Sequence, residues 1–402
     1  MTIAVGINKQ VRYKKETTWG VLAGSTGGNV LRRVTASFNL DKETYQSNEI
    51  RTDYQIQDMR HGVRSASGSL SAELSPGSYA DFFAAALSKD FTAVPNITGV
   101  TVTVTANAGL GTGTVVRDTG SWLTAGVKVG DVVRLSATAN SGKNLLVTAV
   151  SALTLTVKTL NGTDLTAVGV GAVVDVSFPG KKTYAPLTGH TDDSFTFEEW
   201  YSDIAQSEVF TGCKVNTAGV SIPATGLVTA DFSFMGKDLA NTGTTASFTS
   251  PTAQSSTGIF AAVNGVLMIS GAPVAVVTDA SININRNMQN ATVVGSNSVV
   301  DMFEGRIAVD GSFSAYFQDA SIRDLYKDEV EASIVIVMTT SNANDADFIS
   351  IVLPRIKVNS SSKDDGETGL VASHDFMALL NSNGGAGTSS EKTTISIQDS
   401  AA

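Results

Sequence analysis

Cysteine and histidine are scarce in this sequence, and each scarcity excludes a class of site. Cys213 is the only cysteine in 402 residues, which rules out an internal disulfide and a multi-cysteine zinc site. The three histidines, His61, His190 and His374, are dispersed, and no His-x-x-Glu-His spacing exists to hold a catalytic metal. We therefore expect no metal and no cofactor.

Catalytic motifs are missing as well. Gly109-Leu-Gly-Thr-Gly113 is glycine-rich, but a strand-like run follows it, and not the helix N-terminus that binds a phosphate. No Gly-x-Ser-x-Gly elbow occurs. The adjacent carboxylates Asp192-Asp193 and Glu198-Glu199 would point to opposite faces of a strand, so neither pair forms an acid/base couple by itself. We predict no catalytic residues and no enzyme.

Long apolar runs and excess positive charge are also absent. No stretch of about 18 apolar residues could span a bilayer, and the N-terminus has no signal-peptide pattern. We therefore expect no membrane partner, and assembly in the cytosol. The formal net charge is −10, whereas a protein that grips duplex DNA should be basic. Such a chain either ignores polyanions or lets one slide past.

The strongest signal of organisation is an internal repeat in a composition rich in Gly, Val and Thr, which favours a mainly β fold. Ala36-Ser-Phe-Asn-Leu40 recurs as Ala280-Ser-Ile-Asn-Ile284, and Gly68-Ser-Leu-Ser-Ala72 recurs as Gly311-Ser-Phe-Ser-Ala315. Apolar and polar residues alternate in these segments, which predicts half-buried strands. A short helical pattern follows the second strand of each copy. The unit is therefore strand, long polar connection, strand, short helix.

Later matches indicate an insertion in the first copy. Ser194-Phe-Thr-Phe197 resembles Ser333-Ile-Val-Ile336, and Gly226-Leu-Val228 resembles Gly369-Leu-Val371. These pairs lie closer together in the sequence than the earlier pairs do. The first copy must therefore contain extra chain between about Leu87 and Ser194.

The extra chain has a composition of its own. Residues 96–178 are mostly Val, Thr, Ala and Gly, with no glutamate, and contain strand-like runs between turn signals. We predict a separate small β domain there. One repeated unit would then comprise residues 1–95 and 179–245, and the other residues 246–402.

Long polar segments separate the paired strands of both copies. They run from 42 to 64 and from 285 to 306, whereas hairpin loops usually contain two to five residues. Each keeps apolar side chains that suggest ordering against something: Tyr45, Tyr54, Ile56 and Met59 in the first, and Val293, Val294, Val299 and Met302 in the second. The segments are either loops folded over their own domain or interaction arms. We favour arms, because both copies keep the length.

In the order of its segments the sequence resembles the tail tube (major tail) proteins of siphophages. The segments that carry the resemblance are Ser67-Gly-Ser-Leu-Ser-Ala-Glu-Leu-Ser-Pro-Gly-Ser-Tyr-Ala-Asp-Phe-Phe83, Ser194-Phe-Thr-Phe-Glu-Glu-Trp200, Phe210-Thr-Gly-Cys-Lys-Val215 and Gly226-Leu-Val-Thr-Ala-Asp-Phe-Ser-Phe-Met-Gly-Lys237. The resemblance covers residues 1–95 and 180–240 well, 250–402 less well, and not the insert. It implies two tandem β-sandwich tail-tube-like domains, each with one short helix, plus the small inserted β domain.

The resemblance also implies a function and partners. The chain would be a structural protein of the virion tail that assembles into stacked rings around a channel for genome passage during ejection. Two tube units per chain imply a homotrimeric ring with pseudo-sixfold symmetry. The 42–64 and 285–306 arms would reach the adjacent ring, and the insert would project outward. A tape measure protein and a tail terminator are further expected partners. DNA would pass an acidic lumen without specific binding.

Two other functions stay open from the residues alone. A β-sandwich adhesin or receptor-binding virion protein would carry a carbohydrate-type module at 96–178, where Trp122 is the one available aromatic platform. A capsid decoration or baseplate ring protein would share the composition, but it would not need a duplicated tube unit.

Overall fold

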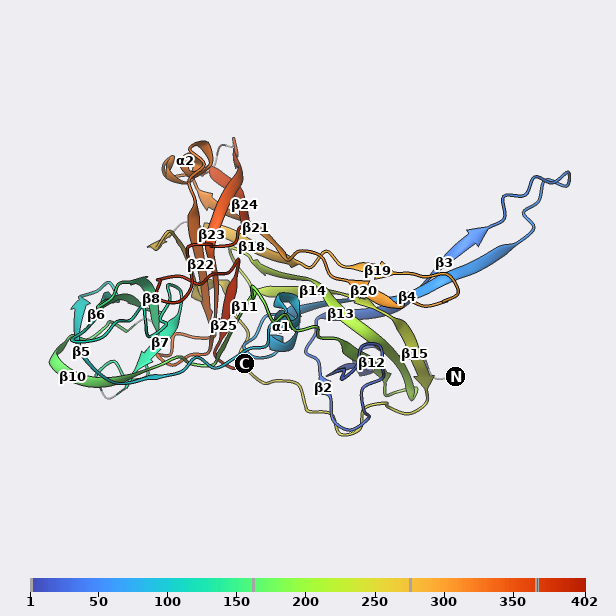
Figure 1. The fold of residues 1–402 in the computed structure, drawn as a ribbon, viewed down its shortest axis with the longest axis horizontal. Coiled ribbons are helices and arrows are strands. Elements are labelled where there is room, and N and C mark those ends of the chain that lie inside the picture. Colours follow the sequence, from blue (N-terminus) through green and yellow to red (C-terminus); the bar gives the residue numbers. More distant parts are fainter. Residues whose placement is uncertain (1–2, 137, 161–162, 275–276, 366, 368) are drawn as a thin grey trace.

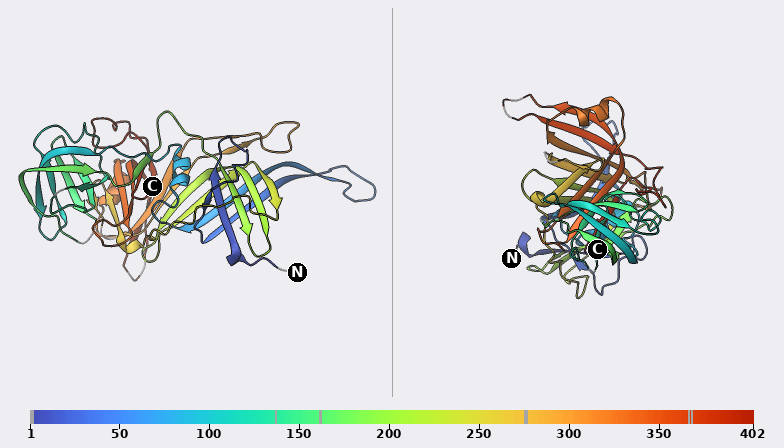
Figure 2. Two further views of the ribbon diagram at one scale, coloured as in Figure 1. Left: turned by 90° about the horizontal axis from the view of Figure 1, so that it is seen from below. Right: turned by 90° about the vertical axis from the view of Figure 1, so that its left-hand side faces the viewer.

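The computed structural model describes residues 3–402 except 137, 161–162, 275–276, 366 and 368. The chain is mainly β, as predicted, and Figure 1 shows a small barrel at one end with two sandwiches beside it. Figure 2 shows a narrow two-stranded ribbon that extends from the opposite end. Among the described residues, no helix is long and apolar enough to cross a membrane.

The first sandwich consists of two sheets that share one long strand, β13. One sheet runs β2-β1-β12-β13-β15 and the other runs β13-β14-β4-β3, because the two halves of β13 have different partners. The elements are η1 (Gly6–Asn8), β1 (Lys9–Lys15), β2 (Asn29–Val30), β3 (Thr35–Gln46), β4 (Met59–Glu73), α1 (Ala80–Leu87), β12 (Phe195–Tyr201), β13 (Gln206–Ile222), β14 (Thr229–Gly236) and β15 (Asp238–Gly243).

The second sandwich repeats this strand order. One sheet runs β17-β16-β22-β23-β25, with β11 added beyond β25, and the other runs β23-β24-β21-β18. The elements are β11 (Lys181–Tyr184), η2 (Ala262–Asn264), β16 (Gly265–Ile269), β17 (Ala272–Pro273), β18 (Val277–Asn285), β21 (Ala308–Tyr316), α2 (Ser321–Lys327), β22 (Ala332–Thr339), β23 (Phe348–Lys363), β24 (Val371–Ala378) and β25 (Ser396–Asp399).

The two sandwiches agree down to single residues. Gly68 lies opposite Phe234, and Gly311 lies opposite Phe376 in the corresponding strands. A Cβ at Gly68 would lie 2.3 Å from the Phe38 ring, and one at Gly311 would lie 2.2 Å from the Ser281 carbonyl oxygen and 2.6 Å from the Phe376 ring. Because an aromatic ring covers each position, no side chain fits there, which explains why both copies of the repeat have glycine.

The inserted segment contains a closed barrel. Its strands are β5 (Ile97–Asn107), β6 (Thr112–Arg117), β7 (Val132–Leu135), β8 (Leu145–Val150), β9 (Thr154–Thr159) and β10 (Val168–Ser177), in the order β10-β5-β6-β9-β8-β7. Alternating Val and Leu side chains fill the interior together with Trp122. The outer face of the barrel, including Val132 and Leu146, packs on Val335 and Phe348 of the second sandwich.

A strand pair joins the sandwiches. The C-terminal half of β13 pairs with β18, from Thr217 opposite Asn285 to Ile222 opposite Ala280. The sheet therefore continues through both units in the order β3-β4-β14-β13-β18-β21-β24-β23. We call this the continuous sheet.

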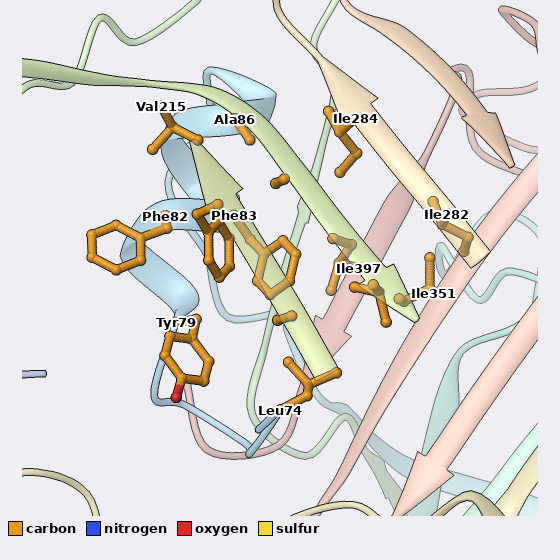
Figure 3. Close-up of a cluster of buried hydrophobic side chains, with 14 of the residues drawn as sticks. Leu74, Tyr79, Phe82, Phe83, Ala86, Val215, Ile282, Ile284, Ile351 and Ile397 are labelled. Atoms are coloured by element: carbon orange, nitrogen blue, oxygen red, sulfur yellow. The ribbon is translucent and has the colours of Figure 1, made fainter. Parts of the chain in front are cut away.

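Helix α1 packs at the junction, and α2 does not pack in the same way. Figure 3 shows Phe82, Phe83 and Ala86 of α1 in one cluster with Ile282 and Ile397 from the second unit. From Phe82 to Leu87 every residue of α1 is buried, whereas α2 has no buried residue.

Candidate functional site

One face of the continuous sheet carries small polar and acidic side chains. Alternation along each strand turns the apolar residues toward the core and these residues away from it. We call the following set the polar face: Ser37, Asn39, Asp41, Ser67, Ser69, Ser71, Glu73, Thr217, Gly219, Ser221, Asp231, Ser233, Asp279, Ser281, Asn283, Asp310, Ser312, Ser360, Ser362, Ser373 and Asp375.

Hydroxyl groups on this face meet across the strands. The Ser37 and Ser69 oxygens are 3.2 Å apart, and those of Ser281 and Ser312 are 2.9 Å apart in the second unit. The same kind of pair joins Thr217 to Ser233, with 2.6 Å between the oxygens. Short side chains that bond to one another give a flat, hydrophilic wall without long protruding groups.

The charges of the polar face are predominantly negative. Its carboxylates are Asp41, Glu73, Asp231, Asp279, Asp310 and Asp375. Over the described ranges none of them makes an ion pair, and Lys357 at the β23 edge, opposite Met377, is a cation that the register places on the same side of the sheet. A predominantly acidic surface of this kind repels a polyanion.

The continuous sheet ends in two unpaired edges. Within the described chain, β3 pairs only with β4, and residues 357–363 of β23 pair only with β24. Unpaired N–H and C=O groups on such edges can pair with another chain. On β3 this applies beyond Phe38, because the Phe38 N–H donates to the Glu199 carboxylate at 3.0 Å and the Ala36 carbonyl accepts from Lys9 at 2.9 Å. The two edges are the counterparts of β18 and β13, which pair with each other inside the chain.

The first arm is a ribbon that stands away from the molecule (Figure 1). Pairing continues from Lys42 opposite Arg64 to Gln46 opposite Met59, so much of the expected loop is strand. Thr and Tyr in this segment favour strands, which explains the difference. All four apolar residues singled out in the sequence, namely Tyr45, Tyr54, Ile56 and Met59, are exposed.

The second arm takes a different course. Its strands β19 (Gln289–Ala291) and β20 (Asp301–Phe303) form a short hairpin, and the Arg64 N–H of β4 donates to the Asn297 carbonyl at 3.0 Å. This arm therefore reaches the first sandwich of its own chain. Val299 and Met302 are buried within the chain, whereas Val293 and Val294 at the tip are exposed.

An ionic cluster of two buried cations, Arg286 and Lys214, and two partly exposed carboxylates, Glu304 and Asp192, holds the base of the second arm at the junction. The Arg286 guanidinium donates to the Ala85 carbonyl at the end of α1 and to the Glu304 carboxylate. The Lys214 ammonium lies 3.3 Å from Glu304 and also pairs with Asp192. Burial raises the pKa of Glu304. Sequence patterns did not reveal this cluster, because its members are far apart along the chain.

The side chains that the sequence singled out as able to react or to bind a ligand lie in packed surroundings. Cys213 is buried in β13, and burial raises the pKa of its thiol. His374 is buried beside Phe313, and burial lowers the pKa of its imidazole. Trp122 is fully buried and donates its indole N–H to the Leu153 carbonyl at 3.0 Å, so it offers no aromatic platform to a sugar. Within the part of the chain that the structure describes, no group of three or more His, Cys, Asp or Glu could hold a metal.

Comparison with known proteins identifies the family. No curated protein matches the chain. A profile described as phage tail tube protein matches residues 6–378, which covers the first sandwich, the barrel and the second sandwich except β25. The adhesin alternative is not favoured by this match. The chain belongs to the phage tail tube protein family and is a structural protein of the virion tail, where it builds the tube.

Proposed function

We propose that three chains join edge to edge and close the continuous sheet into a ring with pseudo-sixfold symmetry. The supporting observation is the junction already present in the chain, where β13 of one tube unit pairs with β18 of the next. The free edges at β23 and β3 are the same two edges, so the same contact can be repeated between chains. Three chains supply six tube units.

The polar face is the proposed wall of the channel. Its carboxylates carry the same sign as the phosphates of DNA, and at physiological salt their repulsion extends over roughly 8 Å. Its serine and threonine side chains are short and pair with one another. Such a wall keeps the genome from adhering while it passes during ejection, so DNA is a passenger and not a specific ligand.

Rings are proposed to stack through the tips of the two arms. Tyr54 and Ile56 on the first tip are exposed, and Val293 and Val294 on the second tip are exposed as well. Exposed apolar side chains of this kind gain by burial against a neighbouring ring. Met59 and Tyr45 lie further back on the ribbon, and Val299 and Met302 support the second arm from inside the chain. A tape measure protein inside the tube and a tail terminator at its end complete the proposed partners.

The barrel at 97–177 is proposed to be a decoration outside the tube. It contributes no strand to the continuous sheet and has its own core. Its attachment to the second sandwich through Val132 and Leu146 holds it at one end of the molecule (Figure 1).

Electron microscopy of the purified chain at high concentration tests this proposal. We expect hollow rings or tubes whose end views show threefold symmetry and six similar units around the channel. True sixfold symmetry with six chains in each ring would refute the trimer. A chain that stays monomeric at every concentration, also after addition of preformed tail tips, would refute ring closure by this protein.

A further inference from the structure

We propose that the contact between chains copies the junction within the chain residue for residue, with Lys42 of one chain taking the place of Arg286 at the end of the neighbour's α2. This inference rests on the proposed ring. It names the surface on each side of the contact and the register in which the edges meet.

A bulge sets the register. In β13 the pairing with β14 shifts between Val215 and Thr217, and in β23 the pairing with β24 shifts between Val358 and Ser360. Thr217 therefore corresponds to Ser360. Because irregularities of this kind are specific features of a strand, they align the two edges without ambiguity.

The partner edge aligns in the same way. Asn283 of β18 and Asn39 of β3 occupy the same place in the repeated segment. Gly219 lies opposite Asn283 inside the chain, and Ser362 corresponds to Gly219. The contact between chains is therefore expected to place Ser362 opposite Asn39, and Ser360 opposite Asp41.

The two helices end in the same manner, which identifies the counterpart of Ala85. Ser88 after α1 and Glu329 after α2 both have positive φ, 54° and 53°. The Lys89 N–H donates to Ala84 at 3.0 Å, and the Val330 N–H donates to Leu325 at 2.9 Å. The Ala85 carbonyl, which accepts a bond from Arg286, therefore corresponds to the Tyr326 carbonyl.

The surface around Tyr326 is exposed, whereas the corresponding surface around Ala85 is covered by the base of the second arm. A shallow cavity of about 510 Å³ lies between the end of α2 and β23, and Tyr326, Val330 and Asn359 are among its lining residues. The side chains of Tyr326 and Val330 are about half exposed, at 45% and 47%. At the junction within the chain, the base of the second arm occupies the matching space through Arg286 and Glu304.

The charges of the open surface also fit a cation from a second copy. Lys357 corresponds to the buried Lys214, since each lies opposite a methionine of the next strand. Glu329 is 84% exposed and lies 4.0 Å from Lys357, whereas the neighbouring Glu331 is held by Arg355 at 2.5 Å. Lys42 follows Asp41 as Arg286 follows Asn285, and it is exposed in the single chain. The base of the first arm thus brings a lysine to a surface on which Glu329 is mostly exposed and lies only at the 4.0 Å limit of an ion pair with Lys357, and the occupant is a second copy of this chain.

Cysteine cross-linking tests the register. The variant Asn39→Cys with Ser362→Cys should give covalently closed trimers when assembled rings are oxidised. The control Ser37→Cys with Ser360→Cys lies four residues out of register, too far for a disulfide, and should give none. Rings that form but cross-link only in the control would overturn the register. A wild-type chain that forms no rings would refute the proposed function itself, so the two failures are distinguishable.

Charge reversal tests the role of Lys42. Lys42→Glu should raise the concentration needed for assembly about tenfold, the effect of losing one charge-assisted contact. Glu329→Lys in the same chain should restore most of the loss. Lys181→Glu, an exposed lysine on β11 that is not part of the continuous sheet or of either arm, should change little. Assembly by the Lys42→Glu variant at wild-type concentration would overturn the proposed contact, whatever the cross-links show.

Discussion

Replacing Arg286 by alanine should loosen the junction inside the chain by a measurable amount. The side chain is 4% exposed and donates to the Ala85 carbonyl and the Glu304 carboxylate. Loss of one partner of a fully buried ion pair costs about 3–5 kcal/mol, because the remaining charge stays buried. Glu304 is 27% exposed, so water compensates in part. We therefore expect the free energy of unfolding to fall by about 2–3 kcal/mol.

Urea unfolding of the unassembled chain measures this loss, and Lys42→Ala is the matched control. Lys42 occupies the corresponding place on the free edge and is exposed, so its removal should change the stability of the single chain by less than about 0.5 kcal/mol. In an assembly assay the Lys42→Ala variant should be the one that is impaired directly, because Lys42 lies in the proposed contact between chains. A loss of less than about 0.5 kcal/mol for Arg286→Ala would refute the role given to the cluster.

Four further predictions follow from the same structure. Phe82→Ala should cost about 3–5 kcal/mol in urea unfolding, since Phe82 is fully buried among the rings in the core of the first sandwich; a loss below about 1 kcal/mol would contradict that packing. Burial raises the pKa of Asp399 from 3.8 to about 6, so the folded chain holds this proton more tightly than the unfolded chain does. The contribution of this group to stability should therefore fall by about 2 kcal/mol between pH 4 and 6.5, and this part of the fall should be absent in Asp399→Asn. Ser361→Pro removes an N–H that faces the free edge of β23, because the N–H groups of Ser362 and Asp364 face β24, and it should abolish rings while near-ultraviolet circular dichroism shows a folded chain, whereas Ser361→Ala should assemble normally. Asp231→Lys with Asp310→Lys should confer salt-dependent binding of duplex DNA in a filter assay, and wild-type behaviour of that variant would refute the proposed electrostatic role of the polar face.

Local sequence was enough to predict the repeated strands. In segments such as Gly68–Ala72 and Gly311–Ala315, apolar and polar residues alternate because one face of the strand is buried, and this alternation can be seen in the sequence itself. The mainly β fold and the resemblance to tail tube proteins followed from the order of such segments. The long arms were also visible, because their length departs from that of an ordinary hairpin.

The path of the two arms could not be predicted from local sequence. Val293 and Val299 belong to the same arm and are equally apolar, yet one is exposed and the other is buried. The difference depends on whether another part of the chain lies beside each residue. The second arm meets the first sandwich of its own chain, whereas the first arm reaches beyond the edge of the molecule (Figure 2).

The sequence by itself determined the strands, the repeat and the surplus of negative charge, because these depend on neighbours along the chain. Only the tertiary structure decided that Asp41, Asp231, Asp310 and Asp375 share one face, because strand order and register place them together. It also decided the difference between α1 and α2. The first helix is covered by the second unit of its own chain, whereas the surface beside the second helix stays open in a single chain.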